Sequence, residues 1–163
     1  MKEFYIDKGN RYCNKYDLPI GKLIFNKSFS YKFIIEAEDC DFDATGSDIW
    51  NSLCGIGAGW KQSDNAIRAM WRFNKEKATF EWCMQREIKG NWITSDSLYG
   101  ATCIVTYNKE KRTFDIQVGD EKATYNLKSD NDQCILSMPV LIEVLPKYSY
   151  IDGSNCTYKI TRI

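Results

Sequence analysis

A near-repeat of eight residues constrains the fold of this chain more than any other feature. The segment Phe73-Asn-Lys-Glu-Lys-Ala-Thr-Phe80 recurs thirty-four positions later as Tyr107-Asn-Lys-Glu-Lys-Arg-Thr-Phe114. Each copy lies between stretches in which apolar and polar residues alternate, which is the period of a half-buried β-strand. A short polar segment between two such stretches indicates a hairpin. The sequence therefore predicts hairpin loops at 74–77 and 108–111 and an antiparallel, all-β protein.

The same alternation extends along most of the chain, and helical periodicity is hard to find. No change of composition and no Gly/Ser-rich linker divides the 163 residues, which is the length of one ordinary domain. We expect a single domain over 1–163 with an antiparallel β-sandwich, jelly-roll-like fold. Its predicted strands lie near 2–6, 21–25, 29–38, 54–60, 65–73, 78–88, 102–107, 112–118, 121–127, 134–145 and 156–162.

Pairing residues outward from each loop assigns side chains to the two faces of each hairpin. The first loop places Phe73 opposite Ala78 and Arg72 opposite Thr79. Its core face then holds Ile67, Trp71, Phe73, Phe80, Trp82 and Met84, and its polar face holds Arg68, Met70, Arg72, Thr79, Glu81 and Gln85. The second hairpin gathers Cys103, Val105, Phe114, Ile116 and Val118 on one face and Thr102, Thr106, Thr113, Asp115 and Gln117 on the other.

The charge balance and the N-terminal sequence limit the partners and the compartment. Lys and Arg together number 22, as do Asp and Glu, so no overall field favours extended nucleic acid or a membrane surface. The first residues carry charges and no apolar signal segment, and no apolar run is long enough to span a bilayer. We expect a cytoplasmic protein whose seven cysteines are reduced. Disulfides are the alternative if a leader has been removed.

The sequence contains no histidine, which excludes Ser-His-Asp and Cys-His catalysis and His-ligated zinc. We expect no cofactor and no enzymatic activity. The run Asp39-Cys-Asp41-Phe-Asp43 begins like a calcium loop, but Ala44 stands where an EF-hand needs Gly and Trp50 where it needs Glu. A solvated acidic loop is the favoured interpretation, and a looser calcium site on the three Asp residues is the alternative.

Arg68 and Arg72 form the most site-like pair, because guanidinium groups bind phosphate or carboxylate in bidentate fashion. Three glycines alternate along 54–60 and would leave a bare strip of backbone against which another group can lie. Packing there is favoured over a ligand, and the arginines could simply be surface charges that flank Glu81. Aromatic rings at Trp50, Trp60, Trp92, Tyr99 and Tyr107 could add stacking surfaces. The predicted ligand-binding residues are Arg68, Arg72, Trp60, Gly57, Gly59 and Tyr99.

The string Asn65-Ala-Ile-Arg-Ala-Met-Trp-Arg-Phe-Asn-Lys-Glu-Lys77, with the strand 80–84 that follows, resembles a motif of small uncharacterised β-sandwich proteins of Bacteroidota and their phages. The resemblance covers roughly residues 47–163. Met70 stands where the motif of that group has Gly. The resemblance implies a jelly-roll-like fold and a phage origin, with the host cytoplasm as the compartment, and it implies no particular activity.

Three functional hypotheses follow from these features. The leading one is a non-catalytic protein that binds a small anionic, nucleotide-like ligand at Arg68 and Arg72, which in a phage would sequester a defence signal. The alternative is a carbohydrate-binding or virion-decorating module whose aromatic rings stack on sugars. The third is a carboxylate-dependent glycosidase, which needs two acids about 5 to 9 Å apart. A homo-oligomer that covers a sheet edge is compatible with each of them.

Overall fold

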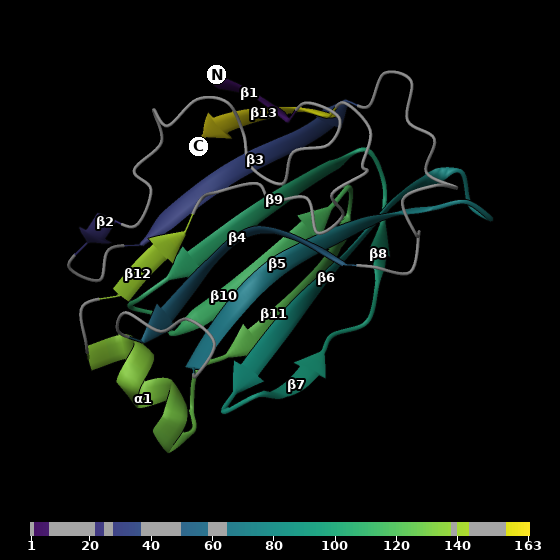
Figure 1. Cartoon of the computed structure of the whole chain (residues 1–163). Helices are drawn as coiled ribbons and strands as arrows, with labels where there is room; N and C mark the ends of the chain where they lie inside the picture. The colour runs from purple at the N-terminus through teal and green to yellow at the C-terminus, as the bar shows by residue number, and fades with distance from the viewer. Residues whose placement is uncertain are drawn as a thin grey trace.

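Two antiparallel sheets stack against each other, as the alternating sequence predicts (Figure 1). The computed structural model describes residues 2–6, 22–24, 28–36, 50–58, 65–137, 140–143 and 156–163. The first sheet has six strands in the order β1 (Lys2–Ile6), β13 (Cys156–Arg162), β3 (Phe29–Glu36), β9 (Thr102–Asn108), β10 (Thr113–Val118) and β11 (Glu121–Asn126). This confirms the predicted all-β sandwich.

The second sheet has seven strands and carries the first copy of the repeat. Its order is β2 (Lys22–Ile24), β12 (Val140–Glu143), β4 (Asn51–Ala58), β5 (Asn65–Asn74), β6 (Thr79–Ile88) and β7 (Asn91–Thr94), and β8 (Leu98–Tyr99) also pairs with β6. The short strands β7 and β8 were not predicted. Strands of four and two residues are too short to show the period of a strand.

Both copies of the repeat form the same turn, one in each sheet, and the predicted register is wrong by two residues. The turn residues are 75–78 and 109–112, so that Phe73 lies opposite Phe80 and Tyr107 opposite Phe114. In each copy the asparagine ends the strand, and its Oδ1 atom accepts a backbone N–H from inside the turn. The distance is 2.9 Å for Asn74 and 2.9 Å for Asn108.

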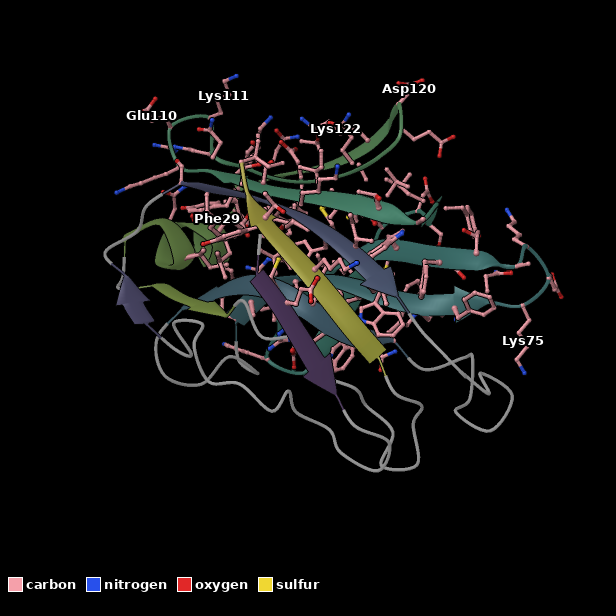
Figure 2. All side chains as sticks on the ribbon, turned by 90° about the horizontal axis from the view of Figure 1, so that it is seen from above. Phe29, Lys75, Glu110, Lys111, Asp120 and Lys122 are labelled. Carbon is pink, nitrogen blue, oxygen red and sulfur yellow. The ribbon has the colours of Figure 1, made fainter. Side chains whose placement is uncertain are left out.

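The last residue of each turn has a positive φ, +48° at Ala78 and +55° at Arg112, which returns the chain to the sheet. Because the side-chain period of a strand is two, a register error of two residues leaves every side chain on its predicted face. The core and polar faces assigned from the sequence are therefore confirmed. The two turns lie at opposite ends of the sandwich, where Figure 2 labels Lys75 and Lys111.

One continuous apolar core lies between the sheets and includes residues from both hairpins. Trp71 and Trp82 lie opposite each other and are fully buried, as are Phe33, Val105 and Phe114 from the other sheet. A side chain of this size contributes about 1.5 to 3 kcal/mol when it is fully buried. Tyr107 belongs to this core with 0% exposure, so the suggestion that it offers a stacking surface is wrong.

A short helix, α1 (Asp130–Ser137), occupies the first part of the predicted strand 134–145. Its sequence begins with a capping box, in which Ser129 and Asp132 exchange side-chain to backbone hydrogen bonds of 3.3 and 2.9 Å. These two bonds satisfy N–H groups that the first turn of a helix leaves unpaired. Of the described residues in the predicted segment, 140–143 form a strand, β12. Among the described residues, no helix is long and apolar enough to cross a membrane.

Candidate functional site

The carboxylate of Glu81 is the centre of a polar cluster on the outer face of β5 and β6. Arg72 lies directly opposite it and donates two hydrogen bonds, from Nε at 2.9 Å and from Nη2 at 3.0 Å. Asn74 donates from Nδ2 at 3.1 Å, and Ser97 donates from its hydroxyl at 2.6 Å. Glu81 is almost fully buried, while 26% of the Arg72 side chain is exposed. The guanidinium is thus held rigidly and still reaches the surface.

These contacts set the charge state of Glu81. Burial alone would raise the pKa of its carboxyl, but the hydrogen bonds from Arg72, Ser97 and Asn74 and the positive charge of Arg72 hold the pKa below its ordinary value of 4.5. The carboxylate is therefore ionised at neutral pH and balances the guanidinium. A depressed pKa stabilises the folded state above pH 4.5, and this stabilisation is lost as the pH falls through the folded-state pKa.

Two half-buried aromatic residues, Trp50 and Tyr99, flank this ion pair. The Arg72 guanidinium carbon lies 4.4 Å from the centroid of the Trp50 ring, a stacked cation–π contact. Tyr99 lies opposite Glu81 across the β6–β8 pair, so its ring is on the same face of the sheet. The ammonium of the exposed Lys77 lies 3.6 Å from the centroid of that ring. We call Trp50, Arg72, Asn74, Glu81, Ser97 and Tyr99 the outer-face cluster.

The segment between β7 and β8 positions two members of the outer-face cluster. Ser95 fixes its start, because its backbone N–H donates to the Met84 carbonyl at 2.9 Å and its hydroxyl accepts from the Met84 N–H at 2.9 Å. The chain then rejoins β6 as β8. Ser97 lies between these two anchors and reaches Glu81, with Tyr99 two residues further on.

The repeat explains why the cluster lies beside the first hairpin and not the second. In both copies the asparagine Oδ1 closes the turn, but only Asn74 also donates to an acidic side chain across the hairpin. The position of Arg72 and Glu81 is taken in the second hairpin by Thr106 and Asp115, which lie opposite each other.

Arg68, the other predicted arginine, is part of a separate and more enclosed ion pair. It donates to Glu87 at 2.6 Å, with side-chain exposures of 15% and 7%. Its stem lies against Gly55 on β4, where an added Cβ would be 2.8 Å from Arg68 Cγ and 2.5 Å from the Ile67 carbonyl oxygen. The close approach that the glycine strip predicts is therefore made at Gly55 by a side chain of the protein itself.

Arg68 and Arg72 lie four residues apart on one face, which is roughly 13 Å along a strand. Each guanidinium group faces a carboxylate of its own. Arg72 flanks Glu81 as the surface-charge interpretation predicts, whereas Arg68 pairs with Glu87 instead. Their role in binding an anion stays a prediction.

The remaining predicted site residues divide between the described and undescribed parts of the chain. Gly57 is buried in the middle of the sheet, between Ala66 of β5 and Leu141 of β12. Gly59, Trp60 and the calcium-loop candidate 39–43 lie outside the described residues. Within the residues that are described, no group of three acidic or cysteine side chains is arranged to hold a metal ion.

No protein-family model matches the chain, and neither does any curated protein with which it was compared. Two galectins are among the solved structures to which it is similar. A toad ovary galectin, solved in complex with thio-digalactose, is 11% identical, with 100% of this chain and 99% of the galectin covered at a TM-score of 0.33. Xenopus laevis galectin-Ib is 9% identical, with 84% and 98% covered at a TM-score of 0.32.

Similarities with TM-scores of 0.33 and 0.32 do not support a conclusion about function. The resemblance to phage proteins and the cytoplasmic location stay predictions from the sequence.

Sequence reasoning missed a third ion pair, which is fully buried. Arg86 points from β6 into the core side of the sheet and donates to Asp132 of α1 at 3.0 and 3.1 Å, with exposures of 2% and 1%. It also donates to the carbonyl oxygens of Ala66 and Glu87. Tyr125 donates its hydroxyl to the same aspartate at 3.2 Å.

Burial opposes ionisation of Asp132, but hydrogen bonds from Ser129 and Arg86 hold the pKa of its carboxyl below the ordinary value of 3.8. The network thus keeps an ionised aspartate inside the fold and ties α1 to β6. We interpret it as structural, because every charge in it meets an opposite one. The capping-box motif at 129–132 is the sequence signal that could have located the helix.

Proposed function

We propose that this protein is a non-catalytic carbohydrate-binding module and that the outer-face cluster binds a neutral sugar. The observation that carries the proposal is the Glu81 carboxylate, held by Arg72, Asn74 and Ser97 beneath two aromatic side chains. Sites for small molecules combine a few fixed polar groups with aromatic surface, and the outer-face cluster has this composition.

The charge balance of the cluster favours a neutral ligand over an anion. Arg72 and Glu81 face each other in a bidentate pair and cancel in net charge. An anion that approached Arg72 would also approach the ionised Glu81 about 3 Å away, which is unfavourable. A sugar hydroxyl both donates and accepts hydrogen bonds, so it suits a site that holds a donor group beside an acceptor group.

The two aromatic side chains supply the apolar part of such a site. Trp50 and Tyr99 flank the ion pair on the same side of the sheet, and an aromatic ring offers a flat surface for the apolar face of a sugar ring. Lys77, which lies over Tyr99, is exposed, so a ligand can displace its ammonium at a cost of about 0.5 to 1 kcal/mol.

The separation of Glu81 and Glu87 on this face favours binding over hydrolysis. Glu81 and Glu87 lie six residues apart on one strand, which is roughly 20 Å, and a glycosidase needs a separation of about 5 to 9 Å. The pKa of Glu81 is lowered and not raised, whereas a general acid needs a raised pKa.

A glycan array tests the proposal, with Arg72→Met as the disruptive variant and Arg68→Met as its matched control. Both variants remove a guanidinium from the same strand, and only Arg72 belongs to the outer-face cluster. We expect the wild type to bind neutral glycans with an affinity that changes little between about 0.15 and 1 M salt. The affinity should fall at least about tenfold in Arg72→Met and change little in Arg68→Met. Absence of glycan binding, or equal losses in the two variants, would contradict the proposal.

A further inference from the structure

Strand β7 exposes two large apolar side chains at an edge of the seven-stranded sheet. Trp92 is 57% exposed and Ile93 is 67% exposed, and all four residues of the strand are exposed. Among the described residues, Ile163 is the other large apolar side chain that is this exposed. In Figure 1 β7 lies at the outer margin of the molecule, beside β6 alone.

The free edge of β7 offers backbone groups for pairing. The turn before it has positive φ at Lys89 (+48°) and Gly90 (+79°), the geometry of a two-residue hairpin. At the other end of β7, the hydrogen bond from the Ser95 N–H to the Met84 carbonyl continues the pairing with β6. Because hydrogen-bonded positions alternate along an antiparallel pair, Asn91 and Ile93 direct their N–H and C=O groups at β6, and Trp92 and Thr94 direct theirs away from the sheet.

The sequence of β7 lacks the charges, the prolines and the bulges that discourage pairing at an edge strand. Natural edge strands carry charges, prolines or bulges that prevent pairing with another chain. The segment 91–94 reads Asn-Trp-Ile-Thr, without a charge or a proline, and its pairing with β6 continues without a bulge. Such an edge can accept another strand.

We propose that β7 is the dimerisation edge of this protein and that it pairs antiparallel with β7 of a second copy around a two-fold axis at Ile93. In that register Ile93 lies opposite Ile93 of the second copy, and Trp92 lies opposite Thr94. The outward-facing groups of Trp92 and Thr94 then form four backbone hydrogen bonds across the axis. Both exposed apolar side chains are covered in the same step.

The neighbouring symmetric register on the side of the turn is weaker. It places the axis at Trp92 and brings Thr94 opposite Gly90, whose φ of +79° is not that of a strand. Only the two hydrogen bonds at Trp92 would then form. The backbone conformation of the turn therefore disfavours the axis at Trp92.

The charges at the two ends of β7 also fit a second copy of this chain. In the proposed register Gly90 lies opposite Asp96 of the second copy, so the exposed Lys89 lies beside an exposed residue of opposite charge. The two-fold axis repeats this pairing at the other end. A four-residue edge buries little area, and we expect a weak dimer with a dissociation constant on the order of 100 µM.

Sedimentation equilibrium of the whole chain across a concentration series tests the dimer. The disruptive variant is Ile93→Lys, and Ile163→Lys is the matched control because it makes the same change at an equally exposed isoleucine away from β7. We expect wild type and Ile163→Lys to dimerise alike and Ile93→Lys to weaken dimerisation at least tenfold. A wild type that stays monomeric to about 1 mM overturns the proposal, as does a dimer that Ile93→Lys leaves unchanged.

Cysteine cross-linking tests the register. Two residues opposite each other at a non-hydrogen-bonded position lie about 4.5 Å apart at Cα, within disulfide range, whereas residues two positions out of register are about 8 Å apart. Under mild oxidation Ile93→Cys should therefore give a covalent dimer and Trp92→Cys should not, with wild type as the background for the native cysteines. Cross-linking of Trp92→Cys in place of Ile93→Cys overturns the proposal. The inference is independent of the proposed sugar site, because β7 shares no residue with the outer-face cluster.

Discussion

The two asparagines of the repeat provide a matched pair of variants, Asn74→Asp and Asn108→Asp. Aspartate keeps the side-chain oxygen that closes each turn, at 2.9 Å from a backbone nitrogen in both copies. At position 74, however, it replaces the Nδ2 group that donates to Glu81 at 3.1 Å with a second carboxylate oxygen. The predicted difference between the two variants therefore comes from Glu81 alone.

The size of the effect follows from that distance. Loss of a hydrogen bond to an ionised group costs about 1.5 to 3 kcal/mol. Two carboxylate charges 3.1 Å apart, at positions 74 and 81, would repel by about 5 kcal/mol at an effective dielectric constant of about 20. Keeping an aspartate protonated at pH 7 costs about 4 kcal/mol, which is less than this repulsion. The new side chain will rotate away or hold a proton, so we expect a destabilisation of about 2 to 4 kcal/mol.

Thermal unfolding monitored by circular dichroism measures this difference. For a chain of this length the destabilisation corresponds to a fall in Tm of about 4 to 16 °C for Asn74→Asp, against about 2 °C or less for Asn108→Asp. The gap should narrow below pH 5, because the proton that relieves the repulsion is then easily bound. Equal losses in the two variants, or a gap that widens in acid, would refute the argument from Glu81.

Three further predictions concern the packing around the cluster and the buried groups. Gly55→Ala should cost about 1 to 3 kcal/mol in urea unfolding, because its Cβ would meet a backbone oxygen of β5 at 2.5 Å, and an unchanged midpoint would show that the contact is not close. Arg86→Met should cost about 3 to 5 kcal/mol, because it leaves a buried carboxylate without its cation. Lys159→Met should cost at most about 1 kcal/mol, because its partner Glu3 is exposed, and similar losses in the two variants would contradict this. Burial raises the pKa of Cys83 and of Cys103 to about 12, so both thiols should resist alkylation at pH 8 in the folded protein and react after unfolding. Peptide mapping after treatment with an alkylating reagent measures this, and rapid labelling of the folded protein would contradict their burial.

The fold was predictable because the period of two and the repeated turn agree with each other. The alternation assigns each side chain to a face, and these assignments survive the register error because the error is an even number of residues. The helix α1 was missed because its first half is polar, its second half runs into the apolar segment predicted as the strand 134–145, and only the capping box marks its start.

The candidate site was less predictable than the fold, because it depends on which residues lie opposite each other across β5 and β6. The predicted pairing placed Arg72 opposite Thr79, whereas the structure places it opposite Glu81. A two-residue error keeps the faces but changes every cross-strand partner, and ion pairs depend on partners. The contribution of Ser97 and Tyr99 depends on β8, which is two residues long and leaves no pattern in the sequence.

The central claim is that the outer-face cluster binds a neutral sugar, and a nuclear magnetic resonance titration tests it most directly. The wild-type protein would be titrated with the neutral glycan that binds best on the array and, separately, with a panel of linear and cyclic nucleotides. We predict that the glycan shifts the indole N–H signal of Trp50 and the backbone amide signals of Arg72, Glu81 and Tyr99, and that the nucleotides leave them unchanged. Shifts at these residues with nucleotides but not with the glycan, or glycan shifts confined to other strands, would contradict the account.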